Sequence, residues 1–291
     1  CHSHQACVPE LLAELGMPWD GVSYKISGIN HMAWLLEISR NGEDLYPIIR
    51  KRAQEGPIYA PTLALRELHP EYADRIPSVA EQFAPDNHHD MVRFEIMKQF
   101  GYFVTESSEH SSEYYPWFIK KDHPELIDRF HIPLDEYPRR CRDQIARWKQ
   151  QAEHLVHNEN LTHTRSSEYA AGIIEALETG RTFGFAGNVL NTGLIDNLPF
   201  DACVEVSCMV NEGHLSPCHM GPLPNQLAAL NRRQIEVHQL TVDAALTRKK
   251  EYIYQAAMLD PHAGSELTID EIRSLVDDLI QAHGDWLPEY H

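Results

Sequence analysis

An apolar, β-rich run interrupted by Gly28-Ile29-Asn30-His31 constrains the fold of this chain more than any other feature. The run extends from Ser23 to Ile38, and such runs are typical of buried strands. A glycine beside two polar residues indicates a backbone bend, so we expect two strands joined there. The bend can aim Asn30 and His31 into a cleft, although the stretch by itself favours a buried, hydrogen-bonded histidine.

The rest of the chain alternates helix and strand patterns without a repeat or a low-complexity linker. Met91–Phe100 has helical spacing and is followed by Gly101, and Thr268 with Glu271 forms a capping box before another helix. Further helices are predicted over 8–15, 143–157, 167–178 and from Pro224 to about Leu259, and strands over 182–191 and 203–210. We therefore expect a mixed α/β fold, dominated by helices, in one domain over residues 1–291.

Residues 102–118 are predicted to be irregular and to carry a concentration of reactive groups. Three carboxylates, an imidazole and a phenol lie between Thr105 and Tyr114. Such groups act as general acids and bases, and a solvated acidic loop is the alternative. The following Tyr115-Pro116-Trp117-Phe118 would anchor the segment against a core. Because an unpaired buried polar group costs about 1–3 kcal/mol, we expect the segment either to face solvent or to surround a polar ligand, and the anchor favours a ligand cleft.

Metal binding is suggested by the 18 histidines and by the opening residues Cys1-His2-Ser3-His4. Thiolate and imidazole suit a borderline divalent cation, and the alternative is that these residues cap the helix that follows. Arg165 precedes an expected helix, where it can hold a hydroxyl-rich or anionic ligand or pair with Glu168 on the surface. The pair His88-His89 is interpreted as an exposed turn.

Charge and cysteine pattern restrict the partners and the setting of the chain. The net charge of −18 argues against nucleic acid or an anionic membrane surface as a partner. No apolar stretch approaches the ~18 residues that span a bilayer. The six cysteines form no C-x-x-C pair, which favours reduced thiols and a cytoplasmic location. No G-x-G-x-x-G or Walker loop occurs, so any nucleotide-binding domain would lie upstream of Cys1.

Taken together and in order, these segments resemble the C-terminal part of glycoside hydrolase family 4, in particular its melibiase-type α-galactosidases. The resemblance spans almost the whole chain. Its segments are 1–3, 28–32, 101–110, 113–114 with 116–118, Arg165 with 168–170, 193–199, 204–206, 227–230, 260–262 and 282–288. It implies a domain similar to the C-terminal domain of lactate and malate dehydrogenases, with the family's N-terminal Rossmann domain absent from this chain.

The resemblance also implies cofactors and site residues. Mn²⁺ would be held by Cys1 and His31, and NAD would be the second cofactor. His2 would assist departure of the leaving group. For the base that removes the C2 proton of the sugar, His110 is the first choice and Tyr114 the second.

The implied reaction departs from two-carboxylate glycoside hydrolysis. NAD⁺ accepts hydride from C3, a base removes the C2 proton, the glycosidic oxygen leaves by elimination, water adds and the hydride returns. Substrate contacts are assigned to Asn30, Glu109 and Arg165, and Glu109 is the third choice for the base. The expected substrate is a melibiose-like α-galactoside, and the expected assembly is a homodimer or homotetramer. The alternatives are an α-glucosidase or α-galacturonidase of the same family, or an isolated metal-binding domain that is inactive without its NAD domain.

Overall fold

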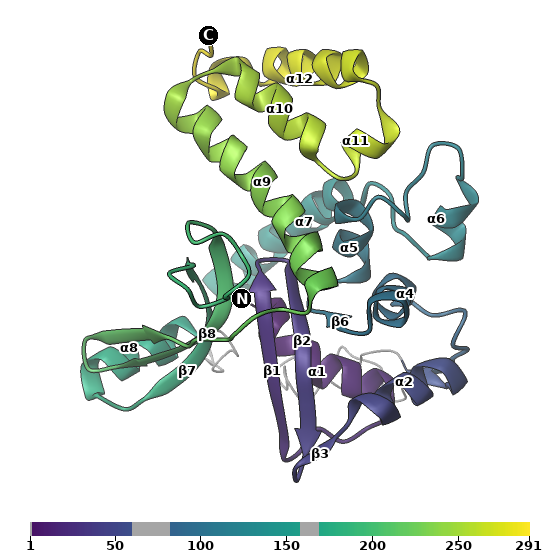
Figure 1. Cartoon of the computed structure of the whole chain (residues 1–291), viewed down its shortest axis with the longest axis vertical. Helices are drawn as coiled ribbons and strands as arrows, with labels where there is room; N and C mark the ends of the chain where they lie inside the picture. The colour runs from purple at the N-terminus through teal and green to yellow at the C-terminus, as the bar shows by residue number, and fades with distance from the viewer. Residues whose placement is uncertain (1, 60–81, 158–168) are drawn as a thin grey trace.

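The computed structural model describes residues 2–59, 82–157 and 169–291, with side chains from residue 6 onward. Within these residues, one antiparallel sheet of seven strands runs in the order β3-β2-β1-β8-β7, with β6 paired to β2 and β9 to β8 (Figure 1). The strands are β1 (Val22–Ile29), β2 (Met32–Arg40), β3 (Glu43–Asp44), β6 (Phe103–Val104), β7 (Phe183–Leu190), β8 (Cys203–Asn211) and β9 (His214–Pro217). A separate antiparallel pair joins β4 (Ile58–Tyr59) to β5 (Gln82–Phe83).

Helices account for most of the remaining described residues. The first group comprises α1 (His2–Glu14), α2 (Tyr46–Glu55), α4 (Met91–Phe100), α5 (Ser108–Tyr114), α6 (Glu125–Arg129) and α7 (Glu136–His157). The second comprises α8 (Ala170–Thr179), α9 (Asn225–Thr247), α10 (Lys250–Leu259), α11 (Ala263–Glu266), α12 (Ile269–His283) and the short η2 (Gly284–Trp286). Figure 1 shows α1 and α2 beside the β1–β2 hairpin and α10–α12 at the far end of α9. No described helix is long and apolar enough to cross a membrane.

The β1–β2 hairpin ends in the two-residue turn Asn30-His31, because Ile29 pairs with Met32. Gly28 is required just before this turn. A Cβ at Gly28 would lie 2.7 Å from both the Cα of Ala33 and the carbonyl oxygen of Met32. His31 takes a left-handed conformation with φ +63°, which is uncommon for a residue with a side chain. The predicted bend is thus a tight turn that places His31 at the tip of the hairpin.

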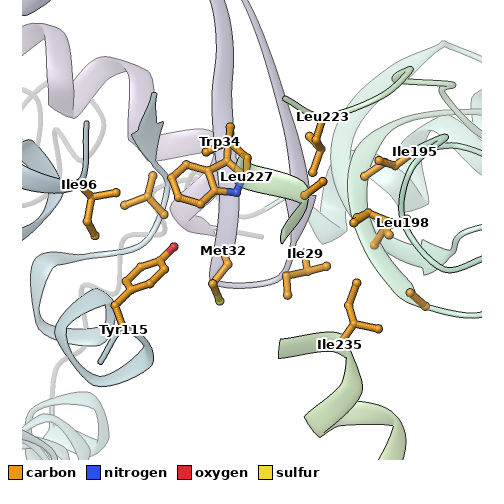
Figure 2. Packing of buried hydrophobic residues seen from close by; sticks show 14 of the residues in the cluster. Ile29, Met32, Trp34, Ile96, Tyr115, Ile195, Leu198, Leu223, Leu227 and Ile235 are labelled. Atoms are coloured by element: carbon orange, nitrogen blue, oxygen red, sulfur yellow. The ribbon is translucent and has the colours of Figure 1, made fainter. Parts of the chain in front are cut away.

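The hairpin is packed on both faces. On one face, Ile26 and Leu35 belong to a buried cluster with α1 and α2. On the other face, Met32 and Trp34 belong to a second cluster, and Figure 2 shows Trp34 between Ile96 of α4 and Leu227 of α9. Because apolar side chains cover both faces of the hairpin near its tip, the tip is held by a well-packed support.

Several expected elements are confirmed. The helix over Met91–Phe100 has the expected bounds and ends at Gly101, which is left-handed with φ +84°. The expected strands correspond to β7 and β8. Thr268 and Glu271 exchange both hydrogen bonds of the capping box that begins α12. The mixed, helix-dominated fold is also confirmed.

Other predictions are wrong, either in the bounds of an element or in the type of structure that a segment forms. Residues 102–118 are not irregular, because they contain β6 and α5. The first helix begins at His2 rather than residue 8, and α7 begins at Glu136 rather than residue 143. The tract after Pro224 is divided into α9 and α10 by Arg248, which is left-handed although it is not glycine. The expected helix over 167–178 corresponds to α8, and its first two residues lie outside the described chain.

Candidate functional site

The centre of the candidate site is a contact between the imidazole of His31 and the carboxylate of Glu106. The strand β6 pairs with β2, and the amide of Thr105 donates to the carbonyl oxygen of Ala33 at 3.0 Å. This pairing carries Glu106 to the hairpin tip, where its Oε2 contacts Nδ1 of His31. Glu106 is buried, whereas the side chain of His31 remains 41% exposed. The contact therefore leaves part of the imidazole accessible from outside.

The electrostatics of this pair favour an ionised carboxylate. Burial alone would raise the pKa of Glu106, but hydrogen bonds from His31 and from the amide of Ser107, at 2.9 Å, lower it to about 2. The same hydrogen bond raises the pKa of His31 against the opposing effect of burial. A carboxylate on Nδ1 fixes the orientation of an imidazole and directs Nε2 to another ligand, as in carboxylate–histidine–metal arrangements.

Helix α5 places two further reactive side chains beside His31. His110 and Tyr114 are four residues apart and share one face of the helix. Their ring centroids lie 5.9 Å and 6.1 Å from that of His31, and 6.4 Å from each other. Nδ1 of His110 lies 3.3 Å from Oε2 of Glu113. An imidazole, a phenol and a carboxylate-paired imidazole thus meet in one place, a combination suited to proton transfer.

The remaining groups of α5 differ in their environments. Burial, with the nearby charge of Glu106, raises the pKa of Tyr114. Glu109 accepts a hydrogen bond from Nη2 of Arg140 at 2.7 Å, and Arg140 also pairs with Glu136. Glu109 is therefore held by α7 as an ion pair. The segment is a partly buried helix whose charged groups have partners, which excludes the alternative of a solvated acidic loop.

Sequence reasoning missed Glu205 as a site residue and gave Glu106 no separate role. Glu205 is buried on β8 opposite Gly28, and its charge contributes to the raised pKa of His31. The sequence contains one signal for Glu205. This acid lies between Val204 and Val206 on a predicted strand, and a buried charge is rarely tolerated without a partner. For Glu106, nothing local indicated contact with a residue 75 positions away.

The hairpin tip has a further buried support in Asn231 of α9, which is fully buried. Its side-chain amide donates to the carbonyl oxygen of Met32 at 2.8 Å, and its Oδ1 accepts from Nε1 of Trp34 at 3.1 Å. Both partners lie within three residues of His31 in the hairpin. Asn231 therefore connects the residue after His31 to the long helix α9.

The structure brings some of the predicted site residues together, whereas others lie outside the described residues. It brings His31, His110 and Tyr114 together and shows Asn30 exposed in the turn beside them. Cys1 and Arg165 lie outside the described residues, and so does the side chain of His2, whose backbone begins α1. The interpretation of His88-His89 as an exposed turn is wrong for His88, which is 1% exposed. The assigned roles of all these residues remain predictions.

Comparison with known sequences relates the chain to one family. Residues 26–263 match the family 4 glycosyl hydrolase C-terminal domain. The chain is 53% identical over 290 residues to an α-galactosidase of Bacillus subtilis. That match covers 100% of this chain but 61% of the relative. The chain thus spans about three-fifths of the length of this relative.

Comparison with solved structures relates the fold to the same group of proteins. A 6-phospho-α-glucosidase from gut microorganisms, in complex with NAD and Mn²⁺, has a TM-score of 0.70 and 19% identity. A second structure of a 6-phospho-α-glucosidase from gut microorganisms, with NAD and glucose-6-phosphate, has a TM-score of 0.73 and 16% identity. Each match covers 100% of this chain and 62% of the solved one. At these identities the likeness establishes the fold.

Proposed function

Because this chain belongs to family 4 of the glycosyl hydrolases, we propose that the complete protein hydrolyses α-galactosides such as melibiose-like disaccharides. The observation that carries the proposal is the 53% identity to an α-galactosidase along all of this chain. The reaction would take place in the cytoplasm, where a ligating thiol stays reduced. The specificity for galactose depends on contacts around one sugar hydroxyl, so α-glucosides and α-galacturonides are the alternatives to test.

The residues at the hairpin tip suit a divalent cation. Glu106 occupies the Nδ1 edge of His31, so Nε2 is the nitrogen available to a metal. We assign this nitrogen and the thiolate of Cys1 as the protein ligands of Mn²⁺, a pairing of imidazole and thiolate suited to a borderline ion. When bound, the cation would act as a Lewis acid toward oxygens of the sugar.

NAD is the second cofactor in the proposal. It would supply reversible hydride transfer at C3 of the sugar, so that no NADH accumulates over a turnover. The 291 residues contain no G-x-G-x-x-G fingerprint. We therefore assign NAD binding to residues of the complete protein other than these.

For the base at C2 we propose His110, with Tyr114 as the alternative. Oε2 of Glu113 lies 3.3 Å from Nδ1 of His110, and this nearby negative charge would stabilise the imidazolium that forms when His110 accepts the proton. Glu109, the third choice, is engaged by Arg140 and thus better suited to holding the substrate or positioning α5. His2 would assist the leaving group, and Asn30 and Arg165 would contact the sugar.

The proposal is tested with the complete protein after removal of Mn²⁺ by a chelator and of NAD by exhaustive dialysis. We expect hydrolysis of a 4-nitrophenyl α-galactoside to return only when both Mn²⁺ and NAD⁺ are added. The corresponding α-glucoside and α-galacturonide serve as competing substrates. Hydrolysis without either cofactor would exclude this chemistry, and metal binding with no turnover of any glycoside would favour the metal-binding domain.

The identity of the base is tested separately by two substitutions. His110→Ala should slow C2 proton removal with little change in Mn²⁺ affinity, and the kinetic isotope effect of C2-deuterated substrate should persist or increase. Tyr114→Phe keeps the ring and removes only the hydroxyl, so it should retain most activity. The opposite pattern, an active His110→Ala and an inactive Tyr114→Phe, would identify Tyr114 as the base.

A further inference from the structure

A buried guanidinium lies between elements that carry the candidate site. Arg93 belongs to α4 and is 4% exposed. Its Cζ lies over the ring of Phe103, 4.2 Å from the ring centroid. Arginine keeps its charge in proteins, and a buried charge is tolerated only where it is paired and hydrogen-bonded. The partners of Arg93 therefore indicate what the fold uses this charge for.

Two of these partners are backbone carbonyl groups in the segment that leads to Glu106. Nε of Arg93 donates to the carbonyl oxygen of Val104 at 3.2 Å, and Nη2 donates to that of Thr105 at 3.3 Å. These two residues directly precede Glu106, whose carboxylate contacts Nδ1 of His31. Among the described strands, β6 is paired with β2 alone. The guanidinium thus supplies the segment with hydrogen bonds in addition to those of the sheet.

The other partners connect the same guanidinium to α5 and α1. Nη1 of Arg93 lies 3.3 Å from Oδ2 of Asp90, and Oδ1 of Asp90 accepts a hydrogen bond from the hydroxyl of Ser108. The oxygen of that hydroxyl accepts from the amide of Arg93 at 3.2 Å. Nη1 also lies 3.8 Å from Oε2 of Glu10 on α1. Arg93 therefore links α1, α4 and the first residue of α5.

The number and direction of these contacts suit arginine and not lysine. All three guanidinium nitrogens have a partner, and their donors point in fixed directions within one plane. A lysine side chain at this position keeps the charge but offers one nitrogen in place of three. Arg93→Lys therefore removes the arrangement of donors while it retains the charge.

The elements that Arg93 links lead to both proposed metal ligands. Helix α1 begins at His2, the residue after Cys1, and the segment over 104–108 brings Glu106 to His31. We propose that Arg93 is a positioning residue that sets Glu106, and through it the imidazole of His31, relative to α1. This role rests on the proposed function, in which Cys1 and His31 are the ligands of Mn²⁺. Misplacement of a reacting group by about 1 Å can slow catalysis about 100-fold.

The role is tested with Arg93→Lys in the complete protein, by titration with Mn²⁺ and by hydrolysis of a 4-nitrophenyl α-galactoside. We expect Mn²⁺ affinity to fall about 10-fold. At saturating Mn²⁺, kcat should fall with little change in KM, because orientation of the reacting groups is lost and sugar contacts are kept. Arg52→Lys is the matched control. Arg52 also donates to two successive carbonyl oxygens, those of Leu15 and Gly16, which follow the far end of α1, and its replacement should change neither quantity.

A double-mutant cycle with Glu106→Gln shows whether Arg93 acts through Glu106. In the Glu106→Gln background, Arg93→Lys should change Mn²⁺ affinity by less than about twofold, because the carboxylate that it positions is already gone. Losses of affinity that multiply across the two substitutions would overturn the proposal. An unchanged Mn²⁺ affinity in a folded Arg93→Lys variant would also overturn it.

Amide hydrogen exchange without metal separates this role from the proposed function. Arg93→Lys should reduce protection of residues 104–110 on the order of 10-fold, whereas Arg52→Lys should leave these residues unaffected. Equal protection in the wild type and in a folded Arg93→Lys variant would overturn the role of Arg93. A wild-type protein that binds no Mn²⁺ would refute the proposed function instead, and the exchange result would then decide the role of Arg93.

A milder variant serves if Arg93→Lys does not fold. Ser108→Ala removes only the hydroxyl that joins Asp90 to the start of α5. We expect it to reduce protection of residues 104–110 and to lower Mn²⁺ affinity, each by less than Arg93→Lys would. A folded Ser108→Ala variant with wild-type exchange and wild-type Mn²⁺ affinity would overturn the proposal.

Discussion

Among the histidine–carboxylate pairs of the described residues, two join partners that are far apart in the sequence, and the pKa of the carboxyl group is shifted in opposite directions in these two. One joins His31 to Glu106 at the hairpin tip, and the other joins Nε2 of His89 to Oε1 of Glu14 at 3.0 Å. In both pairs the partners are 75 residues apart, so both are made by the tertiary fold. The pKa of Glu106 is lowered to about 2, whereas that of Glu14 is raised to about 8.

The difference comes from the surroundings of each carboxyl group. Glu106 receives hydrogen bonds from both His31 and the amide of Ser107. Glu14 is 2% exposed and lies near the charge of Asp90, and its Oε2 has no hydrogen-bond partner among the described residues. Burial and a like charge favour the neutral acid, whereas donated hydrogen bonds favour the carboxylate. The same pair of residue types therefore provides an ionised carboxylate at the hairpin tip and a carboxyl group with a raised pKa in the second pair.

The largest expected effect comes from replacing the imidazole at the hairpin tip. His31→Asn preserves a residue type that tolerates the left-handed φ of +63°, but it removes the proposed metal ligand. We expect Mn²⁺ affinity to fall by more than about 100-fold and glycoside hydrolysis to be lost with it. Isothermal titration with Mn²⁺ and an activity assay measure both, and thermal unfolding checks the fold. His89→Asn, in the second pair, is the matched control and should retain Mn²⁺ affinity.

Replacing the carboxylates of the two pairs should also affect Mn²⁺ affinity unequally, with a smaller loss than replacing the imidazole of His31. Glu106→Gln removes the charge that orients His31, and we expect Mn²⁺ affinity to fall by about 10–100-fold. Glu14→Gln makes the same chemical change in the other pair and should leave Mn²⁺ affinity unaltered. Equal losses in the two variants would mean that Glu106 has no special relation to a metal at His31.

The third prediction concerns the support of the hairpin tip rather than its chemistry. Asn231→Leu removes both hydrogen bonds to the hairpin and leaves the indole N–H of Trp34 and the carbonyl oxygen of Met32 buried without this partner. Each such group costs about 1–3 kcal/mol, so the free energy of unfolding should decrease by at least that much in urea titrations. Gln239→Leu on the same helix removes one hydrogen bond near the surface and should change stability by less than about 0.5 kcal/mol. Similar losses in both variants would contradict a specific role for Asn231.

The last prediction is a pH dependence of stability that belongs to Glu14. Because its pKa is raised from 4.5 to about 8 by burial and by Asp90, the folded state binds a proton more tightly than the unfolded state does. Its contribution is present below pH 4.5 and is lost as the pH rises toward 8, with a slope of at most about 1.4 kcal/mol per pH unit. Glu14→Gln should therefore flatten the loss of stability between pH 5 and pH 8. Urea titrations across this range measure the slope, and an unchanged slope would show that Glu14 is ionised throughout.

The sequence by itself determined the elements whose signals are local. The capping box of Thr268 and Glu271, the glycine after Phe100 and the apolar run around Gly28 each act within a few residues of the element they define. The resemblance across the chain added the family, because ordered agreement over many segments does not depend on knowing the contacts. It also predicts that His31 is a metal ligand.

Only the tertiary structure decided which distant side chains meet. Helix α5 has no apolar periodicity, and it forms where Ser107 caps its first turn and where Ser111 and Ser112 are buried. The break at Arg248 carries neither glycine nor proline, so local chemistry does not mark it. The pairing of Glu106 with His31 follows from β6 lying beside β2, and the raised pKa of Glu14 follows from its burial and from the nearby charge of Asp90. Such contacts, and the electrostatics that result from them, depend on distances through space that a sequence pattern does not contain.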